Sequence, residues 1–143
     1  MQYRTGNSTT WSQYTIDTEI KLTNIGDYVQ FKNINTQLST SSSKYVQFVM
    51  TEKIKAIGNI QSMLNYSDTL TSYCYQNMFY GCSSLTQAPE LPAKKLVTRC
   101  YYGMFQNCKS LIAAPELPAT ELASSCYQNM FNGCTSLITM PSF

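Results

Sequence analysis

Apolar residues in the second half of the chain recur at a fixed spacing of 26 residues. Three copies of the pattern begin at Cys74, Cys100 and Cys126, and the third ends with the chain at Phe143. A fixed period of this length indicates a repeat array, in which each copy buries its apolar side chains against the neighbouring copies. The predicted structural core consists of the aligned residues Cys74, Met78, Phe79, Cys82, Leu85, Cys100, Met104, Phe105, Cys108, Leu111, Cys126, Met130, Phe131, Cys134 and Leu137.

Within each copy, the apolar residues predict a short helix. From Cys100 to Cys108 the apolar side chains fall at positions i, i+4, i+5 and i+8, which lie on one face of about two helical turns. Gly81 and Gly133 fall near the end of this segment in their own copies, where a left-handed residue that closes a helix is expected.

An extended segment is expected after the helix. Residues 111–117 carry spaced apolar side chains, and Pro115 among them has no amide proton to give to a central strand. We therefore predict a short extended stretch in which the proline occupies a position that needs no sheet hydrogen bond. Leu96 and Leu122 complete the apolar set of the first two copies.

Residues 1–66 contain no copy of the repeat and predict a β-rich domain that precedes the repeats of residues 67–143. Because the first copy of an array exposes an apolar edge, we expect this domain to act as a cap. Met1–Thr5 and the region of Trp11 are expected to add a strand, and residues 61–66 a short helix. The main strands are predicted at residues 15–22, 28–31, 45–50 and 54–60.

The repeated motif C-Y-x-x-M-F-x-x-C-x-S-L-x-x-x-P-x-L-P-A-x-x-L resembles the 26-residue subclass of BspA-like leucine-rich repeats of bacterial surface proteins. The resemblance covers residues 73–143, and residues 26–31 and 58–60 weakly resemble the small β-domain before such repeats in gut-bacterial surface proteins. It implies a non-enzymatic protein of adhesion and of host or matrix binding, and related repeats occur in bacteriophage structural proteins. The fold class expected is α+β: a curved, leucine-rich-repeat-type solenoid of about three 26-residue coils, preceded by a small antiparallel β domain.

The composition of the chain argues against a nucleic-acid partner and against a membrane-spanning helix. Charged residues make up 13% of the chain, against about 25% in an average globular protein. The net charge is +2 and the basic residues do not cluster, which argues against nucleic-acid binding. No apolar run reaches the roughly 18 residues of a membrane-spanning helix, so no membrane span is predicted. The first residues do not have the pattern of a signal peptide.

The residues that most often perform catalysis or bind metals are scarce. Histidine is absent, which excludes histidine-based triads and histidine metal sites. The six cysteines follow a C-x7-C spacing that fits neither zinc nor a disulfide across two helical turns, so buried free thiols are expected. Glu90 and Glu116 lie one repeat apart and could form a glycosidase-type pair, but the repetition itself explains their spacing. We therefore predict no enzyme, no cofactor and no metal.

Positions that vary between copies are the better binding candidates. The aligned Tyr75, Tyr101 and Tyr127 suit either contact with a ligand or a role as spacers between copies, and their recurrence favours the spacers. Variable positions on the same segment would face outward instead. The binding candidates are Gln76, Tyr80, Tyr102, Gln106, Gln128 and Asn132.

These observations lead to two functional hypotheses. The first is a non-enzymatic recognition or adhesion module, at the cell surface or secreted, that binds a protein or glycan ligand on another surface. The alternative is a bacteriophage virion structural protein, such as a fibre, tail or decoration protein, that self-assembles as a homo-oligomer.

Overall fold

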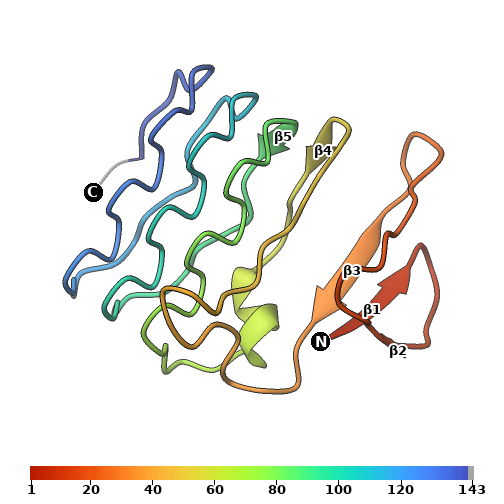
Figure 1. The fold of residues 1–143 in the computed structure, drawn as a ribbon, viewed down its shortest axis with the longest axis horizontal. Coiled ribbons are helices and arrows are strands. Elements are labelled where there is room, and N and C mark those ends of the chain that lie inside the picture. Colours follow the sequence, from red (N-terminus) through yellow and green to blue (C-terminus); the bar gives the residue numbers. More distant parts are fainter. Residues whose placement is uncertain (142–143) are drawn as a thin grey trace.

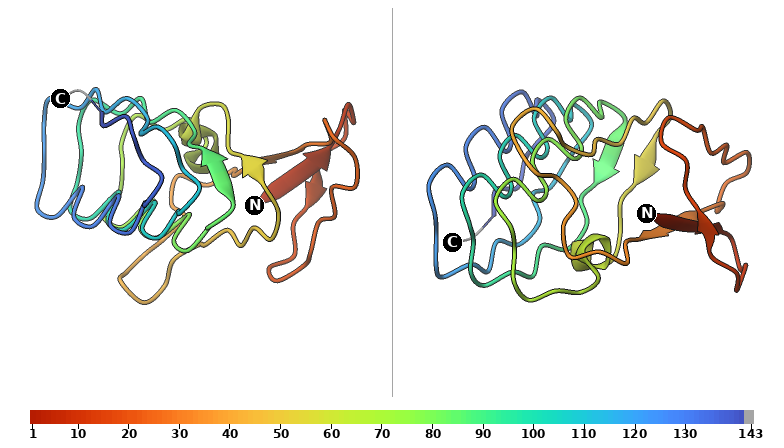
Figure 2. Two further views of the ribbon diagram at one scale, coloured as in Figure 1. Left: turned by 90° about the horizontal axis from the view of Figure 1, so that it is seen from above. Right: turned by 60° about the horizontal axis from the view of Figure 1, so that its bottom comes forward.

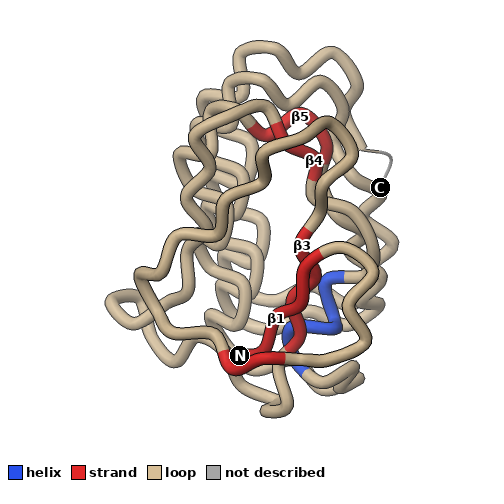
Figure 3. The backbone as a smooth tube through the Cα atoms, turned by 90° about the vertical axis from the view of Figure 1, so that its right-hand side faces the viewer, coloured by secondary structure: helices blue, strands red, loops and turns tan. Residues whose placement is uncertain are grey.

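The computed structural model describes residues 1–141, most of which lie in turns and irregular segments (Figures 1 and 3). The elements follow the order β1, β2, β3, β4, η1 and β5, where η1 is a 3₁₀ helix. Their bounds are Gln2–Thr5 for β1, Ser12–Gln13 for β2, Val29–Lys32 for β3, Ile54–Lys55 for β4, Ile60–Leu64 for η1 and Leu85–Gln87 for β5.

The predicted fold class, α+β with a leucine-rich-repeat-type solenoid, is wrong. Residues 1–141 contain no α-helix, and their few short strands form one sheet of three strands and one of two. The segment of each copy that was expected to be a helix consists of consecutive tight turns.

Backbone geometry shows why these segments are not helical. Tyr73, Asn77 and Gly81 have φ of 66°, 56° and 72°, so every fourth residue of the first turn segment is left-handed, which an α-helix does not allow. Two residues in each group of four then point inward and two outward. This period of four reproduces the i, i+4, i+5, i+8 pattern as well as a helix does.

The amides of the turn segment alternate between two kinds of partner. The amide of Tyr75 donates to the carbonyl of Cys100 in the next copy at 2.9 Å, whereas the amide of Gln76 donates to Tyr73 within its own copy at 3.0 Å. The second and third copies pair in the same way, with Tyr101 donating to Cys126 at 3.0 Å. Hydrogen bonds that would close an α-helix locally are thus used to hold adjacent copies side by side (Figure 2).

Aromatic side chains stack along the same direction. The rings of Phe79 and Phe105 lie 5.6 Å apart and nearly parallel, as do those of Tyr75 and Tyr101 at 5.5 Å. Met104, Phe105, Leu111 and Leu117 are buried between the copies. Of the predicted core residues, only Phe131, Cys134 and Leu137 in the third copy are half-buried, and the other twelve are buried.

One apolar position of the repeat was predicted wrongly. Leu96 is buried, but its counterpart Leu122 is 64% exposed, although both were assigned to the apolar set. The amide of Leu96 donates to Glu121 of the second copy at 2.8 Å, so this strip of the first copy is covered by the second.

Residues 45–60 form a further layer against the first copy, which the sequence comparison of copies did not reveal. The ring of Phe48 stacks on Phe79 at 5.5 Å, and β4 pairs in parallel with β5. A second parallel contact joins Asn59 to Glu90. The segment therefore continues the pairing of the copies, although it shares little of their sequence.

The remaining N-terminal residues form an antiparallel sheet of order β2-β1-β3, at the opposite end of the molecule from the third copy (Figure 1). The strands expected near residues 1–5 and 28–31 and near Trp11 are present, and η1 begins one residue before the predicted short helix. The strands predicted at 15–22 and 45–50 are absent, and only the first two residues of 54–60 form one. Asp17, with φ of 64°, interrupts the first of these segments.

Candidate binding surface

The turn segments place one row of side chains on the outside of each copy. Positions 76 and 80 of the first copy, with their counterparts 26 and 52 residues later, carry the six binding candidates. Because the backbone beneath them is hydrogen-bonded from copy to copy, these side chains stand at fixed intervals.

Tyr102 lies near the middle of this surface and is held by two neighbours. The side-chain amide of Asn129 in the third copy donates to the Tyr102 hydroxyl at 3.3 Å. The guanidinium of Arg99 lies over the Tyr102 ring, 5.3 Å from its centroid. The ring is half-buried and therefore presents an oriented aromatic edge with little conformational entropy left to lose on binding.

Gln76 was predicted to face outward, but it is buried. Only 2% of the residue is exposed, because its side-chain amide donates to the carbonyl of Ser42 in the loop that crosses over the first copy, at 3.1 Å. Gln76 therefore belongs to the contact between that loop and the repeats and not to a binding surface. Its Oε1 has no hydrogen-bond partner among the described residues.

The other candidates remain accessible. Tyr80 is 38% exposed, and its backbone carbonyl accepts a hydrogen bond from the side chain of Gln47. Gln106 is half-buried, while Gln128 and Asn132 are exposed. We call the surface formed by Tyr80, Tyr102, Gln106, Gln128, Asn129 and Asn132 the turn face. It is rich in side-chain amides and hydroxyls, which donate and accept hydrogen bonds without bearing charge.

In the turn segments, asparagine and glycine alternate from one copy to the next at two positions of the repeat. Asn77 of the first copy lies beside Gly103 of the second, at the same repeat position, and a Cβ on Gly103 would meet the Asn77 Oδ1 at 2.5 Å. At the position four residues further along, Asn107 of the second copy lies against Gly133 of the third in the same way. An asparagine in one copy therefore occupies the space that a glycine in the next copy leaves open.

Of the aligned tyrosines, Tyr75 and Tyr101 lie inside and are not available to a ligand, whereas Tyr127 is half-buried. Tyr75 and Tyr101 are fully buried, and the Tyr75 hydroxyl donates to the carbonyl of Ile60 at 3.4 Å. The Tyr101 hydroxyl has no hydrogen-bond partner among the described residues. Burial raises the pKa of both phenols, and of Tyr127 to about 12. These rings act as spacers between copies, which was the favoured of the two interpretations.

All six cysteines are free, and the second cysteine of each copy donates its thiol hydrogen to a neighbouring layer. The Cys82 Sγ donates to the carbonyl of Phe48 at 3.0 Å, Cys108 to Phe79 at 3.1 Å, and Cys134 to Phe105 at 3.0 Å. Burial is the main cause of the raised pKa of all three thiols, which for Cys82 reaches about 11. Only a protonated thiol can donate this hydrogen bond, and a raised pKa keeps the thiol protonated at neutral pH.

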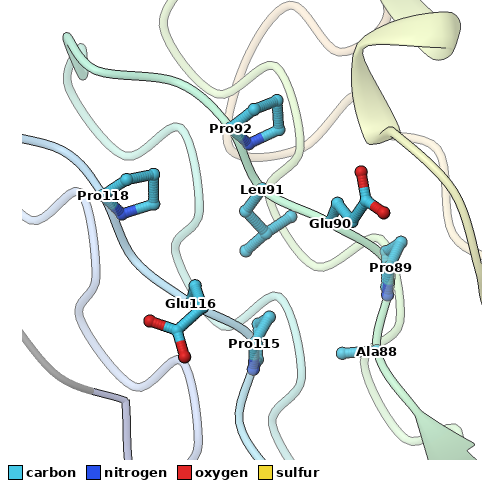
Figure 4. Close-up of a pocket in the computed structure, with 8 residues that line it drawn as sticks. All are labelled: Ala88, Pro89, Glu90, Leu91, Pro92, Pro115, Glu116 and Pro118. Atoms are coloured by element: carbon cyan, nitrogen blue, oxygen red, sulfur yellow. The ribbon is translucent and has the colours of Figure 1, made fainter.

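A shallow hollow of about 220 Å³ lies on another side of the first two copies, lined by their two P-E-L-P segments (Figure 4). The carboxylates of Glu90 and Glu116 point away from one another there, so they do not converge on a common point as a glycosidase pair would. The lining is otherwise mostly proline, whose rings offer no hydrogen-bond donor.

Neither a metal site nor a membrane-crossing helix is found in residues 1–141. No three His, Cys, Asp or Glu side chains in this range come together as a metal-binding group would require. Likewise, none of its helices has the length and apolar character needed to cross a bilayer. Comparison of the chain with protein-family models, with curated proteins and with solved structures gave no match.

Proposed function

We propose that the protein is a non-enzymatic recognition module that binds a protein or glycan ligand through the turn face. The observation that carries the proposal is the row of exposed and half-buried amide and tyrosine side chains on a backbone that is hydrogen-bonded from one copy to the next. A rigid surface of this kind loses little entropy when it binds, and tyrosine and carboxamide groups suit both sugar hydroxyls and peptide groups. The resemblance of the repeated motif to adhesion repeats of bacterial surface proteins supports the same proposal.

Binding to an array of glycans and host proteins would test the proposal. The native chain would be compared with the double variant Tyr102→Ala/Gln106→Ala, which removes the central aromatic edge and a neighbouring amide. Loss of a buried aromatic contact at an interface typically costs 2 kcal/mol or more, so we expect binding to weaken by at least about 30-fold.

The matched control is the double variant Gln87→Ala/Thr120→Ala, which truncates two exposed polar residues outside the turn face. We expect it to bind as the native chain does. A ligand whose affinity drops in the control and not in the turn-face variant would show that recognition uses another surface.

A self-assembling structural protein of a virion is the second candidate, and one observation favours it. The second and third copies expose large apolar side chains, with Ile112 50%, Ile138 82% and Met140 65% exposed, on which another copy of the chain could pack. Mass measurement in solution separates the two candidates. A monomer that binds a ligand supports the recognition module, whereas a stable trimer or larger assembly supports the virion protein.

A further inference from the structure

The outer face of the N-terminal sheet carries a cluster of two cations and the only tryptophan of the chain. The guanidinium carbon of Arg4 lies 4.7 Å from the centroid of the Trp11 ring, and the Nζ of Lys32 lies 4.4 Å from it. Both distances are within the range of a cation–π contact. From the sequence, Trp11 was expected only to lie in or near a strand.

The register of the sheet explains why these residues meet. Gln2 pairs with Lys32 and Arg4 pairs with Gln30, so alternate residues of β1 and β3 share one face. Gln2 also pairs with Gln13 of β2, and Trp11 is two residues before Gln13, which places the indole on the same face.

The opposite face of this sheet is occupied, which leaves the cationic face as the free one. Tyr3, Tyr14 and Phe31 form a cluster with ring centroids 5.6 to 6.5 Å apart, and Phe31 in turn lies 5.2 Å from Phe48. The aromatic side of the sheet therefore packs toward the repeats. On the outer side, Arg4, Trp11 and Lys32 are half-buried and remain partly accessible.

The two cations have no acidic partner. Among the described residues, no carboxylate lies within ion-pair distance of Arg4 or Lys32, and the two ion pairs found there involve other lysines. Instead, the Arg4 Nε donates to the Oε1 of Gln30 at 2.6 Å, which orients the guanidinium and uses one of its five N–H donors. Two like charges held beside one ring repel each other, and an anion bound between them would relieve that repulsion.

From this arrangement we propose that the outer sheet face binds an anionic glycan. Its carboxylate or sulfate groups would pair with Arg4 and Lys32, and the apolar face of a sugar ring would pack on the accessible part of Trp11. The glutamines at positions 2, 13 and 30 lie on the same face and offer both donors and acceptors to sugar hydroxyls.

A glycan fits this face better than a nucleic acid does. Nucleic-acid surfaces combine several aromatic platforms with a long basic groove, whereas this face has one aromatic ring and two cations among neutral amides. The site lies on a different element from the turn face, so the inference does not rest on the proposed function of the repeats.

The emission of Trp11 provides a direct test, because no other tryptophan contributes to the signal. The full chain would be titrated with a sulfated hexasaccharide, an oligogalacturonate, a neutral maltohexaose and a single-stranded oligonucleotide. We expect the two anionic sugars to change the Trp11 emission in a saturable manner that weakens as salt is raised, and the neutral sugar to leave it unchanged. The relative response to the sulfated and the carboxylated sugar identifies the preferred anion.

A pair of matched variants assigns the binding to this face. Arg4→Gln/Lys32→Gln should weaken anionic-sugar binding by about tenfold or more, since a hydrogen-bonded charge contact is worth at least this much. Lys21→Gln/Lys95→Gln removes the same net charge from two exposed lysines elsewhere and should bind as the native chain does. The turn-face variant should also leave this binding unchanged.

Three results would overturn the proposal. The first is an unchanged Trp11 emission when the native chain is titrated with the anionic sugars. The second is an equal loss of affinity in Arg4→Gln/Lys32→Gln and in Lys21→Gln/Lys95→Gln. The third is binding of the oligonucleotide as tight as that of the sugars. If Arg4→Gln/Lys32→Gln does not fold, the titration of the native chain and the single variant Lys32→Gln still decide the matter.

Discussion

The alternation of asparagine and glycine between copies gives a quantitative test of how the copies pack. Gly103 has φ of 57°, and a Cβ at this position would meet the Asn77 Oδ1 at 2.5 Å. Gly81 has φ of 72°, and its Cβ would meet no atom within 4 Å. The substitutions Gly103→Ala and Gly81→Ala therefore share a backbone cost and differ in the contact with the neighbouring copy.

The two costs can be separated. A left-handed conformation costs a residue with a side chain about 1 to 2 kcal/mol, and this should be the whole effect of Gly81→Ala. In Gly103→Ala, Asn77 must also leave its side-chain conformation, which adds about 1 kcal/mol. We expect Gly103→Ala to lower the free energy of unfolding by about 2 to 3 kcal/mol.

Urea unfolding followed by far-UV circular dichroism, in the presence of a thiol reductant, would measure these differences. Asn77→Gly removes the obstructing side chain, so in that background Gly103→Ala should cost no more than Gly81→Ala does in the native chain. The double-mutant cycle should give a coupling of about 1 kcal/mol between positions 77 and 103. Equal costs for the two alanine variants, or a coupling near zero, would refute the packing argument.

Three further predictions concern the buried core. Phe105→Ala should lower the free energy of unfolding by about 3 to 5 kcal/mol in the same assay, since it empties a fully buried site between two other rings, and a loss under 1 kcal/mol would contradict the described packing. Tyr101→Phe should be neutral or stabilising because it removes an unpaired buried hydroxyl, whereas Tyr75→Phe should be destabilising by about 1 kcal/mol because it removes a hydrogen bond; the opposite order would show that the hydroxyl of Tyr101 is satisfied. Ionisation of the thiols should leave stability unchanged between about pH 6 and 8 and lower it from pH 9 toward 11, because the pKa of Cys82 and of Cys100 is near 9 in the unfolded chain but about 11 in the fold; a free energy of unfolding that rises from pH 9 to 11 would contradict the sign.

Much of the core was predictable because an apolar residue that recurs at the same position of each copy is expected to be buried between the copies. Met104, Phe105 and Leu111 each have an identical counterpart in both other copies, so they could be assigned to the interior without knowledge of the backbone. The left-handed residue at Gly81 was predicted at the correct place, although in the wrong context, because glycine is favoured wherever φ is positive.

The candidate binding surfaces were harder to predict from the sequence than the core was. Gln76 occupies the same repeat position as Tyr102 and Gln128, yet a loop from a distant part of the chain covers it. The cluster around Trp11 depends on a register between three strands that are far apart in sequence. A signal for it existed in the alternation of polar and apolar residues along β1 and β3, which places Arg4 and Lys32 on the faces opposite Tyr3 and Phe31.

The sequence by itself determined the period, the inward residues and the absence of histidine chemistry, because these depend only on residue type and spacing. The tertiary structure alone decided between helix and turn, since the same i, i+4, i+5, i+8 pattern satisfies both. That choice depends on where each amide finds a carbonyl, and here every second amide, as in Tyr75 and Tyr101, finds it in the next copy. For the same reason the layer of residues 45–60 could not be predicted, because backbone hydrogen bonds and one stacked ring join it to the repeats and neither requires a repeated sequence.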